Sequence, residues 1–362
     1  MKNIVVVVDA SLRYNQPYMR YAIRKIRSKI GLIDSIQYLN KQDNDLFFHL
    51  EEIIQRYTNI IIITKESFTL LGKILSTLSE DLLVAHEGVL IPSKFNKYEK
   101  RSCLLISDKK SINLLQVDEL SSMPNILIPS SPKRIEFYLI DADSDRYKEQ
   151  LKNIIKIYNL NLVKSPIING VSFVQVHGFQ HDQWDGFVSA IKLGFVEKVL
   201  FGNELSKIIV DKLIASKETI TCSESCSGGL LASELVKHSG VSAIFRGSVV
   251  TYANEIKSLL VNVSSDTLEK YGAVSQEVVL EMLDGSISLL NSDFALAISG
   301  VAGPTGGTIE KPIGTVIVGA KSRKGETIIK KLHLSGDRRY IQEQSVLWAL
   351  KLLILTKKDT FF

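Results

Sequence analysis

The chain has 362 residues, 45% of them hydrophobic and 23% charged, which is the composition of an ordinary globular protein with two or three domains. Its formal net charge of +5 comes from scattered lysines and arginines without a block of like charges, so a nucleic-acid partner is not expected. Three cysteines exclude a disulfide framework, and no apolar run reaches membrane-spanning length. We therefore expect a cytoplasmic protein with no membrane association.

Residues 1–130 alternate between strand-like and helix-like patterns. The apolar run Ile4–Val8 predicts a buried strand, and apolar residues at helical spacing follow it as far as Ile26. A second helix and strand are predicted between Leu46 and Ile63. This alternation is typical of an α/β domain with a mostly parallel sheet, which binds ligands at its strand ends. The loops at these ends carry no phosphate-binding glycine cluster, which argues against a nucleotide site.

A stretch rich in proline and serine, residues 121–133, predicts a linker. Beyond it, a β-α-β-α pattern over residues 134–202 predicts a small α+β module. His177, His181 and Asp182 form a candidate metal trio in this module. His177 is expected to end a strand and no further ligand accompanies the three, so a structural role is favoured and no metal is predicted.

Residues 203–362 form a longer, glycine-richer α/β domain whose first loop, SESCSGG, is the most informative stretch of the chain. This loop places Ser225 and Cys226 after a predicted strand, just before the pair Gly228 and Gly229 that opens a helix. Backbone N–H groups at a helix start bind phosphates or stabilise oxyanions. The loop therefore predicts chemistry or anion binding.

A second motif, GVSAIFRGSVVTYANEIK, places Ser242 before a strand and Tyr252 at the end of that strand. Lys257 follows in the first turn of a helix that Asn254 is expected to cap. The positive field of a helix start disfavours a charged lysine, and a neutral amine is a useful base. A Ser–Lys pair with an assisting Tyr activates a hydroxyl without histidine. A solvated surface lysine is the competing interpretation.

Two further motifs predict binding of an anionic substrate. ISGVAGPTGG follows a predicted strand directly, and its glycines let backbone amides approach a ligand closely. SGDRR places Arg338 near a helix start, where a guanidinium binds a phosphate or carboxylate bidentately, and Arg246 is a second candidate. The candidate binding residues of the glycine-rich loop are Gly300, Gly303, Thr305, Gly306 and Gly307.

These motifs, together with YGAVS at residues 271–275, resemble in order and spacing the C-terminal domain of the CinA family, the nicotinamide-mononucleotide amidohydrolases (PncC). The resemblance covers roughly residues 203–356. It implies a three-layer α/β/α fold and hydrolysis of nicotinamide mononucleotide to nicotinate mononucleotide and ammonia. It also implies that no metal or cofactor is needed, that the role is pyridine-nucleotide recycling, and that the protein is a homodimer.

The upstream domain order is similar to that of full-length CinA proteins, in which a molybdopterin-binding-like α/β domain precedes a small KH-like module. The family's first domain carries a TGGLGPT-type loop, whereas residues 64–70 here read TKESFTL. The first domain is thus predicted to be degenerate, without pyrophosphatase activity. The middle module has no GxxG loop, so RNA binding is not expected either.

We predict a serine-type amidase in which Ser242 attacks the carboxamide carbon, Lys257 takes the serine proton, and Tyr252 relays it to the leaving ammonia. Ser225 is the second candidate nucleophile or an orienting partner. Arg338 and the glycine-rich loop are expected to hold the ribose phosphate.

Two alternatives stay open at this point. Cys226 would be the nucleophile if the helix start lowered the pKa of its thiol. The chain would instead be a non-catalytic CinA-like accessory protein, serving competence or DNA repair through partner binding, if the motifs served recognition alone.

Overall fold

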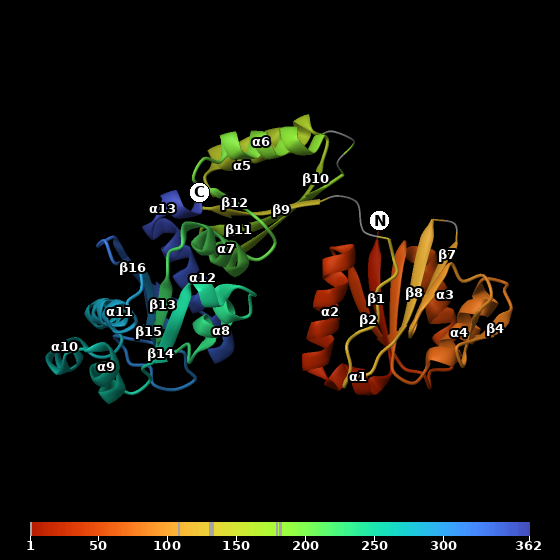
Figure 1. Cartoon of the computed structure of the whole chain (residues 1–362), viewed down its shortest axis with the longest axis horizontal. Helices are drawn as coiled ribbons and strands as arrows, with labels where there is room; N and C mark the ends of the chain where they lie inside the picture. The colour runs from red at the N-terminus through yellow and green to blue at the C-terminus, as the bar shows by residue number, and fades with distance from the viewer. Residues whose placement is uncertain (1, 108, 130–133, 179, 181–182) are drawn as a thin grey trace. The chain divides into compact units, whose positions relative to one another are not determined.

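The computed structural model describes residues 2–107, 109–129, 134–178, 180 and 183–362. The chain divides into two compact units, residues 1–132 and 133–362, both drawn in Figure 1. Helices alternate with parallel strands in both units, which confirms the predicted α/β class. Of the candidate metal trio, His177 ends a strand as predicted, whereas His181 and Asp182 lie outside the described residues. None of the described helices is both long and apolar enough to cross a membrane.

The first unit is a sheet covered by helices on both faces. Its elements are β1 (Asn3–Val8), α1 (Ala10–Tyr14), α2 (Gln16–Ile30), β2 (Ser35–Leu39), α3 (Leu46–Arg56), β3 (Asn59–Thr64), α4 (Phe68–Leu78), β4 (Leu83–His86), β5 (Val89–Pro92), β6 (Lys97–Glu99), β7 (Ser102–Ser107) and β8 (Lys110–Gln116). The main sheet has the order β2-β1-β3-β8-β7-β6, and its first four strands are parallel. Because α2 packs on one face and α3 and α4 on the other (Figure 1), β1 and β3 are apolar between their polar ends, Asn3, Asn59 and Thr64.

The second unit begins with an antiparallel sheet of order β10-β11-β9-β12, with two helices on one face. Its elements are β9 (Arg134–Ile140), α5 (Asp145–Ile157), β10 (Asn161–Ile168), β11 (Val171–His177), α6 (Gln183–Gly194) and β12 (Val199–Phe201). The predicted β-α-β-α order is incomplete because it lacks β10 and β12. β10 is an edge strand that contains Pro166 and leaves most side chains at least partly exposed, and β12 has only three residues, so neither shows a clear apolar pattern.

The rest of the second unit is a sheet between two helical layers. Its elements are α7 (Leu205–Ser216), β13 (Ile220–Glu224), α8 (Leu230–Val236), a 3-10 turn (Val241–Ala243), β14 (Phe245–Val250), α9 (Asn254–Val261), α10 (Ser265–Tyr271), α11 (Gln276–Leu290), β15 (Phe294–Gly300), β16 (Thr315–Ser322), β17 (Thr327–His333), α12 (Arg338–Thr356) and α13 (Lys358–Phe361). The strand order is β14-β13-β15-β16-β17. α7, α8 and α12 pack on one face and α9 and α11 on the other, as Figure 1 shows.

The register of the three parallel strands decides which loops meet. Glu224 at the end of β13 pairs with Val250 of β14 and with Ile298 of β15. The loops that follow these strands therefore emerge at one edge of the sheet, where α/β folds bind ligands. Residues from all four motifs, including those around Lys257, lie at this carboxyl edge.

Candidate active site

A cavity of about 350 Å³ opens at the carboxyl edge of the C-terminal sheet. The loops after β13, β14 and β15 and the first residue of α12 form its walls. The predicted site residues that line it are Ser225, Tyr252, Lys257, Gly300, Gly303, Thr305, Gly306 and Arg338. Sequence reasoning thus found most of the cavity. It missed several lining residues, among them Asn254, Ala273 and Ser299.

Lys257 is a buried residue, with only 1% of its surface exposed, which excludes the solvated surface lysine. Its Nζ donates hydrogen bonds to the carbonyl oxygens of Thr251 (2.8 Å) and Tyr252 (3.2 Å) and lies 3.3 Å from Ser225 Oγ. Burial lowers the pKa of Lys257. The predicted direction is therefore found, and its largest cause is the loss of solvent around the amine. Asn254 is the first residue of α9 and not its cap, which is Ala253.

Ser225 occupies a tight turn directly after β13. Its backbone amide donates to Ile298 O at 2.9 Å, and its carbonyl accepts from the amide of Gly228 at 3.1 Å. Its side chain is buried in the wall of the cavity and faces Lys257. The structure therefore brings the second candidate nucleophile, rather than the first, next to the lysine.

Glu224 holds this turn, a role that sequence reasoning missed although the residue stands inside the SESCSGG loop. It is fully buried. Its carboxylate accepts hydrogen bonds from the backbone amides of Gly229 (3.0 Å), Leu231 (3.0 Å) and Ala232 (2.9 Å) and from the hydroxyl of Ser248 (3.2 Å). The helix start that was predicted to receive a substrate anion is thus occupied by a carboxylate of the chain itself. Gly228 and Gly229, both at positive φ, shape the turn and do not line the cavity.

The prediction that Ser242 pairs with Lys257 is wrong. Ser242 lies in the 3-10 turn before β14, and Lys257 lies beyond the other end of that strand. A strand of six residues is roughly 20 Å long, so the two side chains belong to opposite edges of the sheet. Arg246, the second residue of β14, is exposed at the same edge as Ser242 and is likewise outside the cavity.

Cys226 lines the cavity beside Ser225, but its thiol is not activated. Burial raises the pKa of Cys226 to about 12, so the thiolate required for nucleophilic attack is disfavoured. The predicted lowering by the helix start is wrong, since Glu224 already occupies that position.

Arg338 ties two walls of the cavity together. Its guanidinium donates to the carbonyl oxygen of Gly303 at 2.7 Å and to the phenol oxygen of Tyr252 at 3.1 Å. Gly300 allows the loop to lie close to the neighbouring strand, because a Cβ there would meet Thr315 O at 2.9 Å. Gly307 belongs to the same loop but is not part of the cavity lining. Among the described residues no group of His, Cys, Asp or Glu is arranged to hold a metal ion.

In the first unit, the buried residue Asp9 lies at the carboxyl end of β1, the corresponding edge of that sheet. Its carboxylate accepts hydrogen bonds from Thr64 Oγ1 (2.5 Å), Ser67 Oγ (2.9 Å) and the backbone amides of Lys65 (2.8 Å) and Glu66 (3.1 Å). Burial alone would raise the pKa of Asp9, but these hydrogen bonds hold it below its ordinary value. An internal carboxylate thus takes the amides that a glycine-rich loop would offer to a phosphate.

The fold and the cavity define the C-terminal part of the chain as a three-layer α/β domain with a serine–lysine site at its sheet edge. Residues 202–356 match the family described as the CinA C-terminal domain. This part of the chain is therefore a CinA C-terminal domain.

Known proteins of this family match different shares of the chain. A relative from Thermoanaerobacter sp. (strain X514) is 34% identical over 274 residues, which are 69% of this chain and 65% of the relative. A "CinA-like protein" of Fervidobacterium nodosum is 41% identical over 174 residues, 48% of this chain and 42% of that protein. The crystal structure of competence/damage inducible protein CihA from Agrobacterium tumefaciens is 33% identical, and the match covers 43% of this chain and 98% of that one at a TM-score of 0.42. The chain thus spans less than two thirds of the length of these curated relatives.

Proposed function

We propose that the C-terminal domain hydrolyses the carboxamide of nicotinamide mononucleotide, releasing nicotinate mononucleotide and ammonia. The observation that carries the proposal is the environment of Lys257. A neutral amine has two N–H donors and one lone pair, and Nζ has two carbonyl acceptors and one hydroxyl within 3.3 Å. When the carbonyl oxygens of Thr251 and Tyr252 take the two donors, the lone pair is left for the hydroxyl proton of Ser225.

The proposed reaction has two halves. Ser225 Oγ attacks the carboxamide carbon while its proton passes to Lys257 Nζ, and the C–N bond then breaks as Nζ returns the proton to the leaving ammonia. Water next attacks the resulting ester, gives a proton to Lys257, and releases nicotinate mononucleotide. Ser225 recovers its proton from Lys257, so the sum is carboxamide plus water giving carboxylic acid plus ammonia, which exchange a proton in water to become nicotinate and ammonium.

The other walls of the cavity suit the remainder of this substrate. Arg338 supplies a cation at the mouth, beside the exposed loop residues Thr305 and Gly306, where a ribose phosphate would lie. Tyr252 lines the same side, with its phenol oxygen bonded to Arg338 rather than to Lys257. We therefore propose that Tyr252 orients the substrate, and its role as a proton relay stays a prediction.

The test is ammonia release from nicotinamide mononucleotide by the purified chain in the presence of a chelator. Ser225→Ala and Lys257→Met should each lower turnover by at least about a thousandfold while the melting temperature shows that the fold is kept. Ser242→Ala is the matched control, since it removes a hydroxyl at the opposite edge of the sheet, and its turnover should be unchanged.

Two results would contradict the proposal. Loss of turnover in Ser242→Ala with retention in Ser225→Ala would show that the nucleophile is assigned wrongly. Absence of ammonia release from the unmodified chain would instead favour the non-catalytic accessory protein.

A further inference from the structure

Helix α2 of the first unit carries an unusual concentration of positive charge. Its fifteen residues, QPYMRYAIRKIRSKI, include five arginines and lysines and no acidic residue, and none occurs between Ala10 and Ile33. Charges of one sign spaced four residues apart, such as Lys25 and Lys29, destabilise a helix. Residues 20–29 thus carry five positive charges in ten consecutive positions of one helix.

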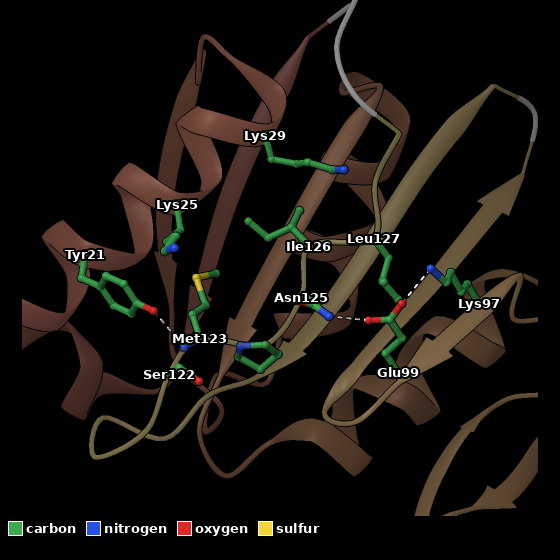
Figure 2. Close-up of a pocket in the computed structure, with 11 residues that line it drawn as sticks. Tyr21, Lys25, Lys29, Lys97, Glu99, Ser122, Met123, Asn125, Ile126 and Leu127 are labelled. Atoms are coloured by element: carbon green, nitrogen blue, oxygen red, sulfur yellow. Dashed lines mark hydrogen bonds and ion pairs between the residues drawn. The ribbon is translucent and has the colours of Figure 1, made fainter. Parts of the chain in front are cut away.

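Lys25 and Lys29 face a groove of about 480 Å³, drawn in Figure 2. Tyr21 lies on the same side of α2, and Lys29 extends across the groove toward the segment of residues 122–127 that forms the opposite wall (Figure 2). Lys97 and Glu99 of β6 complete the lining. The volume is within the range of small-molecule sites, which is about 300–1,000 Å³.

The opposite wall is fixed in place by hydrogen bonds. The amide of Met123 donates to Tyr21 Oη at 3.2 Å, and the amide of Leu127 donates to Asn113 Oδ1 at 2.7 Å. Met123, Ile126 and Leu127 also pack against the core of the first unit. The groove is therefore shaped before any ligand arrives, which lowers the entropic cost of binding.

The groove carries an excess of positive charge. Glu99 is satisfied within the groove, because it pairs with Lys97 at 2.7 Å and accepts from Asn125 Nδ2 at 2.6 Å. Lys25 and Lys29 have no ion-pair partner among the described residues. Two free ammonium groups one helical turn apart, about 5–6 Å between Cβ atoms, match two neighbouring phosphates.

We propose that this groove binds a free nucleotide carrying at least two phosphates. Lys25 and Lys29 hold the phosphates, and the Tyr21 ring together with Met123 and Ile126 contacts the base. The apolar face of α2 is buried in the core, so this helix does not offer the exposed apolar surface that a membrane-bound helix needs. The site lies wholly within the first unit and is independent of the proposed amidase activity.

Equilibrium binding of ADP, AMP and adenosine to the full chain, measured by calorimetry, tests the proposal. ADP should bind more tightly than AMP, and AMP more tightly than adenosine. The double variant Lys25→Gln/Lys29→Gln should weaken ADP binding about tenfold or more, which corresponds to about 1.4 kcal/mol. The matched control Arg20→Gln/Arg24→Gln removes the same charge from α2 outside the groove and should leave the affinity within about twofold of the unmodified value.

Further results distinguish binding in this groove from binding in the cavity of the second unit and from general electrostatic attraction. Arg338→Gln alters the cavity of the second unit and should not change ADP affinity. Equal weakening by the two double variants would reduce the effect to general electrostatics and overturn the proposal, as would equal binding of ADP and adenosine. Binding of single-stranded DNA without binding of ADP would also overturn it.

Discussion

Lys257 can act as a base only while its amine is uncharged, and its surroundings control that state. Burial removes the water that would stabilise the ammonium form, so the pKa of Lys257 falls. The side-chain oxygen to which it is hydrogen-bonded is the hydroxyl of Ser225, and the carboxylate of Glu255 raises its pKa by less than burial lowers it. A lysine paired with Asp or Glu would instead be held in its charged form, and it would be useless as a base near neutral pH.

A pH profile tests this state directly. Because the neutral amine is the active form, kcat/KM for nicotinamide mononucleotide should rise with pH along a limb centred below 10.5, the ordinary value for lysine. The stability of the folded chain should change with pH in the same direction. The unfolded chain holds this proton more tightly than the folded one, so the free energy of unfolding should rise with pH between the folded pKa and 10.5. Ammonia release measured from about pH 6 to about pH 10 gives the limb, and Ser242→Ala should share it. Activity that falls over this range would contradict a neutral-amine base.

The choice between Ser225 and Ser242 shows what the sequence could and could not predict at this scale. The motifs identified both serines and the lysine, and the prediction paired Ser242 with Lys257 because the two stand in the same motif. A strand between two residues carries them to opposite edges of a sheet, whereas residues on neighbouring parallel strands meet at the same edge. The pairing of Ser225 with Lys257 across 32 positions depends on that register, which a motif does not reveal.

At the scale of elements, the short helix α8 and the end of β13 are joined by Glu224. A helix of seven residues is too short to be stable by itself, so its first turn needs a partner for its free amides. Glu224 provides this partner, and it precedes Ser225 by one residue. Its carboxylate stabilises the helix start, and we expect it also to position Ser225 by holding the turn.

Glu224→Gln should separate these two effects. The amide keeps the size of the side chain but loses its charge and turns one acceptor into a donor that faces backbone N–H groups, at a cost of about 1–3 kcal/mol. We expect a lower melting temperature, a kcat reduced at least tenfold by misplacement of Ser225, and a nearly unchanged KM. Ser248→Ala removes only the 3.2 Å hydrogen bond and should show a much smaller loss. A lower melting temperature with full kcat would mean that Glu224 serves the fold alone.

Predicted elements agree with the structure where a strand or helix buries a continuous apolar face. β1 and β3 could be predicted because both of their faces are covered. β10 could not, because its edge position leaves polar side chains on both sides. The burial of Lys257 likewise had no signal of its own, since the partners of its Nζ come from two separate loops, after β13 and after β14.

At the scale of the whole molecule, the second unit has a core that crosses its two sheets. Tyr138, Ile140 and Val171 of the antiparallel sheet pack in the same cluster as α7 and α12. Lys351, which is only 4% exposed, reinforces this contact by donating to Asp141 Oδ1 at 2.6 Å and Asn169 O at 3.0 Å. Its ammonium group also lies 4.8 Å from the centre of the Trp348 ring. Residues 133–362 should therefore unfold as one cooperative unit.

Asp141→Asn tests that cooperativity. Removing the charge leaves the buried ammonium of Lys351 without a carboxylate, and because Asp141 is partly exposed we expect a loss of about 1–3 kcal/mol rather than the larger cost of a fully buried pair. Lys351 lies thirteen residues along α12 from Arg338, roughly 20 Å at 1.5 Å per residue, so turnover at saturating substrate should not change. Asp145→Asn, which breaks an exposed pair with Lys148, is the control and should leave stability unchanged.

Urea unfolding of the Asp141 variant should shift the transition of the whole second unit, because the shared core couples the antiparallel sheet to the sheet that carries Ser225. A transition that moves only the signal of the antiparallel sheet would show that the sheet that carries Ser225 is stable without it.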